Sequence, residues 1–434
     1  MRVLLVNKFH WPKGGSETYH FALAEGLRAS GNDVAFFSMQ DERNLPCGQE
    51  RYFVPASDYN GKSSPVAKAR EALAIAYSRE ALRRFEALCR DFRPDVVHMS
   101  LVHRQITLSI LDAPYLAENR VPVVWTSHDY IAVCPSYTML DGEGRVCDAC
   151  LDSDFSHCVE RRCVKGSRAK SALAAHEARS IRRRGLYGKI DRIIAPSGFM
   201  RGKLLEGGFP DSQVIHMQNF AKDEVLARAR ADADATDRER PHLLFFGRLS
   251  SEKGVDVLVD AFLSIANRIP GWRLVIAGEG PEREAIKAQL AGHPDGRCVE
   301  LVGFQRGEAL SSLVASASLA ISPSRWRENM PYSVVEAFAA GTPVVGTRIG
   351  GIPELVSEGG TGFLAEPGDA DSLAEAILRG VALCDDLGAY HAIQSRCRAY
   401  VLERCDQTRY MEGIVSLYRE LIEEKKGAGR ESRD

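Results

Sequence analysis

The chain has 434 residues, a length that predicts two domains rather than one. With 45% hydrophobic residues, 26% charged residues and a formal net charge of −2, it has the composition of a soluble globular protein, and its charge does not favour nucleic acid as a partner. No stretch approaches the roughly 20 apolar residues of a membrane span. The first apolar run, residues 3–6, is too short for a signal peptide, so we expect a cytoplasmic protein.

Short apolar runs typical of β-strands alternate with amphipathic helical patterns along most of the chain. We expect strands at residues 2–7, 33–39, 95–100, 121–129, 191–197 and 213–219 in the first half, and at 242–247, 273–278, 299–303, 319–324 and 342–347 in the second. Nearly continuous apolar strands followed by helices are typical of parallel sheets covered on both faces. Because the pattern restarts in each half, we predict an α/β protein of the GT-B kind, with two Rossmann-like, doubly wound domains that face each other across a cleft.

The domain boundaries are predicted from changes in composition. Residues 222–241 are rich in alanine and charge without apolar periodicity, and we interpret them as a linker between an N-terminal domain, 1–221, and a C-terminal domain, 242–404. Residues 405–424 have the pattern of an amphipathic helix, which we expect to pack back on the N-terminal domain. The last residues, 425–434, are expected to be disordered.

Candidate ligand-binding residues follow the ends of the expected strands, which is where open α/β sheets bind ligands. Gly14 and Gly15, after the first strand, would let the backbone approach a ligand, although a tight turn explains them equally well. Arg248 and Lys253 lie in "GRLSSEKG", after the strand at 242–247. Two cations beside the amides of a helix N-terminus would bind a diphosphate without a metal, whereas the alternative is a solvated surface loop.

The stretch "SRWRENMPYSVVEAFAAGTPVV" holds two glutamates, Glu328 and Glu336, eight positions apart. Pro331 suits the first turn of a helix that ends near Ala340, so Glu328 would lie at the mouth of the helix and Glu336 one to two turns along it. A carboxylate accepts hydrogen bonds from two vicinal hydroxyls, so a sugar and a ribose are the expected partners. Ordinary surface charge is the alternative interpretation.

The second half of the chain resembles the donor domain of the retaining glycosyltransferases of family 4, which have the GT-B fold. Their E-x7-E motif matches Glu328 to Glu336, and their G-R-x4-K-G element matches "GRLSSEKG". The stretches "GEGPERE", "LVGFQ" and "IGGIPELV" fall in the family's order, as do "GGSETYHFALAEGLRASGNDV" and "PDVVH" in the first half. The resemblance covers nearly the whole chain except a cysteine-rich segment.

The resemblance implies a role for each matching residue. Arg248 and Lys253 would hold the diphosphate of the donor, Glu328 would bind hydroxyls of the donor sugar, and Glu336 would bind the nucleotide ribose. His128 of "TSHDY" would contact the transferred sugar. Four further positions would meet the substrate through backbone atoms: Gly15 and the amides of Asn329 and Met330 near the diphosphate and sugar, and Phe304 at the base.

The implied reaction is a hexosyl transfer with retention from a nucleotide diphosphate sugar, UDP- or GDP-linked, to a glycan or lipid-linked acceptor. It would serve polysaccharide or glycolipid synthesis and require no cofactor, and no residue is assigned as general base. A GT-B epimerase would act without an acceptor, and a sugar phosphorylase would need a cofactor lysine that the sequence does not place. A catalytically silent relative is disfavoured because Arg248, Lys253 and both glutamates are intact.

Five of the 11 cysteines lie between residues 134 and 163. The C-x2-C pair among them has the spacing of zinc ligands around a tight turn. We expect a structural zinc held by Cys147, Cys150, Cys158 and Cys163, with Cys134 or His157 as substitutes. Free thiols in a loop, an iron–sulfur centre and a disulfide are the alternatives. A zinc-containing nucleic-acid-binding module is a further class of function, disfavoured because the cysteines interrupt a βα repeat.

Residues 161–192 carry eleven Lys and Arg against Glu177 and Asp191. A basic face near the acceptor would rest on anionic lipid at the inner face of a membrane and bring the enzyme to a lipid-linked acceptor. A solvated helix face explains the same charges equally well.

Overall fold

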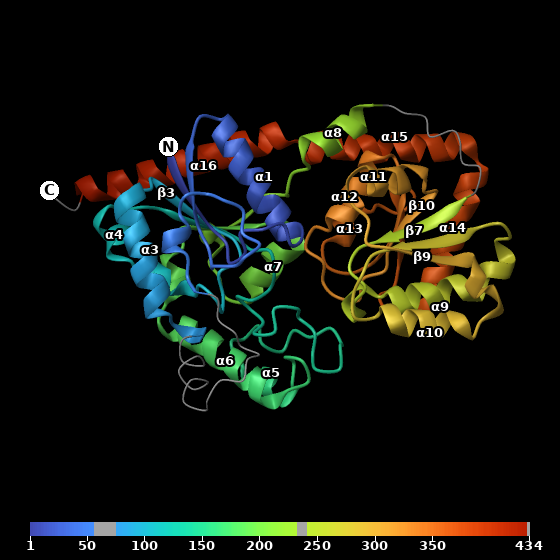
Figure 1. Ribbon diagram of the computed structural model, residues 1–434, viewed down its shortest axis with the longest axis horizontal. Helices are drawn as coiled ribbons and strands as arrows, with labels where there is room; N and C mark the ends of the chain where they lie inside the picture. Colours follow the sequence, from blue (N-terminus) through green and yellow to red (C-terminus); the bar gives the residue numbers. More distant parts are fainter. Residues whose placement is uncertain (56–74, 232–240, 432–434) are drawn as a thin grey trace. The chain divides into compact units, whose positions relative to one another are not determined.

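The computed structural model describes residues 1–55, 75–231 and 241–431, without the side chains of 428–431. It contains two compact units: an N-terminal unit, Met1–Asn219 with Thr408–Asp434, and a C-terminal unit, Phe220–Gln407 (Figure 1). No helix among the described residues combines the length and apolarity needed to cross a membrane.

The N-terminal unit is built on a parallel six-stranded sheet in the order β2-β1-β3-β4-β5-β6. Its strands are β1 (Arg2–Val6), β2 (Asp33–Phe37), β3 (Val96–Met99), β4 (Val123–Thr126), β5 (Arg192–Ala195) and β6 (Val214–His216). Leu4 pairs with Ala35 on one side and with Val97 on the other. These central residues are buried because helices cover both faces of the sheet, as parallel sheets require.

The C-terminal unit repeats this design with the order β12-β11-β10-β7-β8-β9. Its strands are β7 (His242–Phe246), β8 (Arg273–Ala277), β9 (Val299–Gly303), β10 (Leu319–Ser322), β11 (Val344–Thr347) and β12 (Gly362–Ala365). All pairings are parallel. The predicted fold class, α/β with two doubly wound units, is therefore confirmed, and β12 is a strand that the sequence reading missed.

Helices lie on both faces of each sheet (Figure 1). Those of the N-terminal unit are α1 (Gly15–Ala29), α3 (Arg79–Phe92), α4 (Pro114–Glu118), α5 (Ser156–Glu160), α6 (Arg168–Arg183), α7 (Gly198–Glu206) and α16 (Gln407–Glu431). Those of the C-terminal unit are α8 (Asp223–Arg230), α9 (Val255–Ile265), α10 (Arg283–Ala291), α11 (Gly307–Ser316), α12 (Tyr332–Ala339), α13 (Ile352–Leu355), α14 (Ala370–Asp385) and α15 (Leu387–Arg404).

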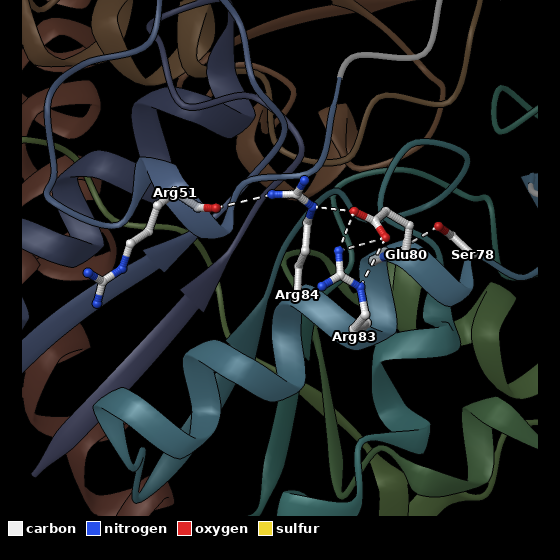
Figure 2. A network of polar contacts seen from close by, with 6 residues as sticks. Arg51, Ser78, Glu80, Arg83 and Arg84 are labelled. Atoms are coloured by element: carbon white, nitrogen blue, oxygen red, sulfur yellow. Dashed lines mark hydrogen bonds and ion pairs between the residues drawn. The ribbon is translucent and has the colours of Figure 1, made fainter.

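Helix α3 shows how local chemistry begins a helix in this chain. Ser78 precedes the helix and its hydroxyl accepts a hydrogen bond from the amide of Ala81, which satisfies one of the free amides of the first turn. Glu80 then contacts Arg83 at 2.9 Å and Arg84 at 2.6 Å, one turn along the same face (Figure 2). The guanidinium of Arg84 also donates to the carbonyl of Arg51 at 3.1 Å, which joins α3 to the segment after β2.

The C-terminal helix α16 belongs to the N-terminal unit. Its Tyr410 hydroxyl lies 2.6 Å from that of Tyr19 on α1, and Tyr418 hydrogen-bonds to His98 on β3. The helix continues to Glu431, so the expected disordered tail from residue 425 is helical over its first part. Within this stretch, Lys425 pairs with Asp191 at 2.7 Å, which joins the helix to the residue before β5.

The expected linker is also partly helical. Its first half forms α8, whose Leu226 and Ala229 are buried in a core shared with α12 and α15. The spacing of these two residues, three positions apart, places them on one helix face. The remainder, 232–240, lies outside the described residues.

Candidate functional site

The order of the strands in the C-terminal unit indicates where a ligand would bind. The chain enters the sheet at β7, continues to β8 and β9 on one side, and then crosses to β10 on the other side of β7. In open α/β sheets, ligands bind beyond the carboxyl ends of the strands where the order reverses in this way. The loops that leave β7 and β10 at this edge are 247–254 and 323–331, and they carry Arg248, Lys253 and Glu328.

An ion pair joins these two loops. Lys253, at the end of a short 3₁₀ helix (Ser251–Lys253), places its Nζ 2.6 Å from Oε1 of Glu328. The hydroxyl of Ser324 donates to the same oxygen at 2.7 Å. Burial by itself would raise the pKa of Glu328, but the charge and hydrogen bond of Lys253, with the bond from Ser324, outweigh burial and lower it. Glu328 is therefore a buried, ionised carboxylate, 5% exposed.

The backbones of the two loops are in direct contact. Gly254 has φ of +66°, and a Cβ on it would lie 2.1 Å from the carbonyl oxygen of Pro323. The amide of Arg325 donates to the carbonyl of Glu252 at 2.9 Å, and the Arg325 guanidinium pairs with Asp256. Only glycine fits at position 254, so the final glycine of "GRLSSEKG" sets the distance between the loops.

Two further loops pack against these two, each through a glycine. After β8, Gly280 lies against the carbonyl of Leu249, where a Cβ would approach to 2.1 Å. After β11, Gly350 has φ of +59° and lies against Glu328, whose carbonyl accepts from the amide of Gly351 at 2.7 Å. The strands β8, β7, β10 and β11 are neighbours in the sheet. The four loops that follow them are therefore in direct backbone contact, each with the next.

The remaining predicted residues of this unit have different surroundings. Arg248 is exposed and makes no ion pair with any described residue. Phe304 follows β9 and is 69% exposed. Asn329 and Met330 lie between Glu328 and the start of α12. The structure therefore joins Lys253 to Glu328 by direct contact.

Glu336 lies on α12 and is half-buried. Burial raises the pKa of its carboxyl group, Arg228 and Lys222 oppose the rise, and Glu224 adds to it. These three neighbours come from α8 and the residue before it, so the segment expected as a linker forms the surroundings of Glu336. No hydrogen bond or ion pair joins Glu336 to Glu328 in the described part of the chain.

In the N-terminal unit, the strand order reverses at β1 and β3. Gly15 is the exposed first residue of α1, after the loop that leaves β1. His128 lies two residues beyond β4, with its ring 4.9 Å from that of Tyr19. Burial lowers the pKa of His128 to about 4, so the ring is neutral near pH 7. Its Nε2 is buried and has no hydrogen-bond partner among the described residues.

Several residues of the site were not predicted from the sequence. The hydroxyl of Ser324 and the close approaches of Gly254 and Gly350 appear only once the loops are folded together. The two glycines gave a signal, since each lies just beyond a strand in a short glycine-containing loop. For zinc, no three described His, Cys, Asp or Glu side chains are already placed to hold a metal ion, so the metal stays a prediction.

Comparison with known proteins assigns the family. The model described as Glycosyltransferase Family 4 matches residues 13–221, and that described as Glycosyl transferases group 1 matches 240–382. A glycogen synthase from Mycobacterium tuberculosis is 37% identical over 426 residues, covering 92% of this chain and 89% of that protein.

Solved structures agree with this assignment at the level of the fold. Sucrose-phosphate synthase from Thermosynechococcus elongatus aligns with a TM-score of 0.67 and 20% identity, covering 97% of this chain and 98% of that one. HepE from Anabaena, in complex with UDP, aligns with a TM-score of 0.65 and 18% identity, covering 97% and 100%. The chain belongs to glycosyltransferase family 4 and has the GT-B fold.

Proposed function

We propose that this glycosyltransferase moves a sugar from a nucleotide diphosphate sugar to a glycan or lipid-linked acceptor, with retention at the anomeric carbon. The observation that carries the proposal is the buried, ionised Glu328 held by Lys253 at the strand-order reversal of the C-terminal unit. The names of relatives agree with a nucleotide-sugar donor, since HepE structures hold UDP and UDP-glucose.

The diphosphate would bind at the cations of the loop after β7. An ammonium group has three N–H donors, and Glu328 uses one of those of Lys253, so two remain for phosphate oxygens. Arg248, exposed on the same loop, would add a fork of donors that suits a phosphate. Negative charge grows on the diphosphate as the sugar leaves, and these cations would stabilise the charge without a metal.

The sugar and the ribose would bind at the carboxylates. Lys253 and Ser324 both contact Oε1 of Glu328, so Oε2 is the oxygen offered to donor-sugar hydroxyls. Glu336, near the charges of α8, would accept the ribose hydroxyls. From the N-terminal unit, the unsatisfied Nε2 of His128 would bind a hydroxyl of the transferred sugar. Phe304, Gly15, Asn329 and Met330 would contact the base, diphosphate and sugar.

The stereochemical outcome is tested by following the wild-type protein with UDP-, GDP- and ADP-sugars by proton NMR. We expect slow transfer to water that releases the nucleoside diphosphate and first forms the sugar anomer with the configuration of the donor. The inverted anomer would contradict retention. An epimerised nucleotide sugar, or turnover that requires inorganic phosphate and a glycan, would instead establish an epimerase or a phosphorylase.

For the acceptor, we propose a polysaccharide or glycolipid pathway at the inner face of a membrane. The exposed cations of residues 161–192 are Arg161, Arg162, Lys165, Arg168, Lys170, Arg183, Arg184 and Lys189. Not every cation in this range is available, since Arg182 donates to the carbonyls of Ala132 and Gly207. Sedimentation with vesicles that contain anionic lipid, and not with neutral vesicles, is the expected result; sedimentation independent of anionic lipid would contradict the proposal.

A further inference from the structure

Five cysteines surround one small cavity in the N-terminal unit. The cavity has a volume of about 10 Å³, and its sulfur-bearing walls are Cys134, Cys147, Cys150, Cys158, Cys163 and Met139. This is the space of a single water-sized particle. Thiolate sulfurs are good ligands for a soft cation, and His157, whose imidazole can also bind zinc, lines the same cavity.

The segment around the cavity has little core of its own. Cys150, Phe155 and Cys158 form a small buried cluster with Ala175 and Ala178 of α6. Val133 and Met139 belong to the main core of the N-terminal unit, and Leu151 packs against it. Backbone hydrogen bonds hold the rest, including those from the amide of Cys147 to Met139 at 2.9 Å and from Gly142 to Arg161 at 3.0 Å. A cross-link through a bound ion would stabilise the part of the loop that these apolar contacts do not hold, by offsetting the conformational entropy of ordering it.

The five thiols do not have equal surroundings. The backbones of Cys158 and Cys163 are joined directly, because the amide of Cys163 donates to the carbonyl of Cys158 at 3.1 Å. Cys134 and Cys150 line the same cavity as this pair. Two thiols have a side-chain partner at 3.1 Å: Cys134 contacts the hydroxyl of Ser136, and Cys147 accepts a hydrogen bond from the guanidinium of Arg161. Only the partner of Cys147 is charged.

We propose that the cavity is a structural zinc site whose ligands are Cys134, Cys150, Cys158 and Cys163. The four thiols would each lose a proton as one Zn²⁺ binds, which gives a tetrahedral site with a net charge of −2. Since the sulfurs are not yet in coordinating positions, their side chains must turn toward the cavity on binding. Cys147, the other half of the C-x2-C pair, stays outside the set with Arg161, whose positive charge lies beside the anionic site.

The zinc would fasten the loop that leaves β4. Cys134 lies six residues after His128 in this loop, whereas Cys158 belongs to α5 and packs near α6. Coordination of both would fix the far end of the loop to these helices. The site does not depend on the proposed sugar transfer, so metal content and activity test separate claims.

The test is metal analysis of the full chain purified without chelator, for wild type and for serine variants. We expect about one zinc per chain in wild type, Cys147→Ser and the distant control Cys47→Ser, and loss of most of it in Cys134→Ser and Cys163→Ser. Iron in place of zinc, or a wild-type protein without metal whose cysteines react freely or form a disulfide, would overturn the site. Zinc retained by Cys134→Ser but lost by Cys147→Ser would overturn the ligand set.

A second measurement covers variants that fail to fold. Wild-type protein, denatured with a chromogenic chelator present, should release about one equivalent of zinc, and reconstitution with cobalt should give the visible absorption of a tetrahedral thiolate site. Absence of both signals from the wild-type protein contradicts the proposal independently of any variant.

Discussion

The contact between Lys253 and Glu328 is the residue-level feature on which the proposed donor site depends. The two residues are 75 positions apart in sequence, and the strand order brings them to 2.6 Å. Both matched the family's motifs, so the sequence predicted the pair. It did not predict that they touch, or that Ser324 shares the same carboxylate oxygen, because these facts depend on how the loops fold together.

Replacing Lys253 by alanine should lower kcat/KM by roughly 100- to 1000-fold, since a preorganised charge on the leaving group typically contributes that much. Steady-state assays with the preferred nucleotide sugar measure the loss. Lys287→Ala is the matched control, because Lys287 is on α10 and pairs with the exposed Glu284. Turnover of Lys253→Ala within threefold of the control would remove the phosphate assignment.

The unsatisfied nitrogen of His128 gives a second prediction. His128→Phe keeps a ring beside Tyr19 and removes a buried polar atom that has no partner among the described residues, so the melting temperature should be unchanged or higher. Turnover should fall at least about tenfold if Nε2 binds the transferred sugar, the loss expected for about 1.4 kcal/mol. A variant that is both stable and fully active would show that the histidine does not contact substrate.

Glu177 should make the stability of the N-terminal unit depend on pH. Burial raises its pKa from 4.5 to about 7, against the opposing charge of Arg104. The folded protein therefore binds the proton more tightly, and this carboxyl group lowers stability as pH rises from 4.5 to 7. The free energy of unfolding of Glu177→Gln, relative to that of wild type, should increase by about 2 kcal/mol from pH 5 to pH 8. Chemical denaturation of both proteins at both pH values measures this change. The same difference in unfolding free energy between the two proteins at pH 5 and pH 8 would contradict the raised pKa.

At the scale of elements, the sequence predicted the strands that carry β-branched and aromatic residues in continuous runs. It missed β12, "GFLA", because Gly362 weakens the strand signal. The structure explains this glycine: a Cβ there would lie 1.8 Å from the carbonyl oxygen of Val344 on β11. It also missed α8, whose apolar spacing is short and surrounded by charge, so that only burial of Leu226 in the C-terminal unit identifies it.

The turn after β11 should be sensitive to any side chain. In Gly350→Ala the new Cβ would meet the backbone of Glu328 at 2.3 Å, in addition to the strain of φ +59°. Gly359→Ala is the control, since its φ is +68° but nothing lies within 4 Å. We expect a cost of about 1 kcal/mol for the control and clearly more for Gly350→Ala, with reduced turnover. Equal melting temperatures for the two variants would contradict this close packing.

At the scale of the whole molecule, each unit repeats one sheet design, and each has a strand-order reversal with polar residues in the loops beyond it. The chain returns to the N-terminal unit through α16, whose tyrosines hydrogen-bond to Tyr19 and His98. The βα alternation made the two-unit fold predictable. The limits of α8 and α16 were not, because tertiary packing and ion pairs rather than periodicity decide where they begin and end.

The central claim is that the C-terminal unit binds a nucleoside diphosphate at the loops after β7 and β10. The most direct measurement is the thermal shift of the wild-type protein with UDP, GDP, ADP, CDP and TDP, repeated on Arg248→Ala and Lys253→Ala. At about 100 times its Kd, the correct nucleotide should add roughly 2.7 kcal/mol, a shift of a few degrees. One nucleotide should stand out and its effect should shrink in both variants. No shift with any nucleotide, or an equal shift in the variants, would contradict the account.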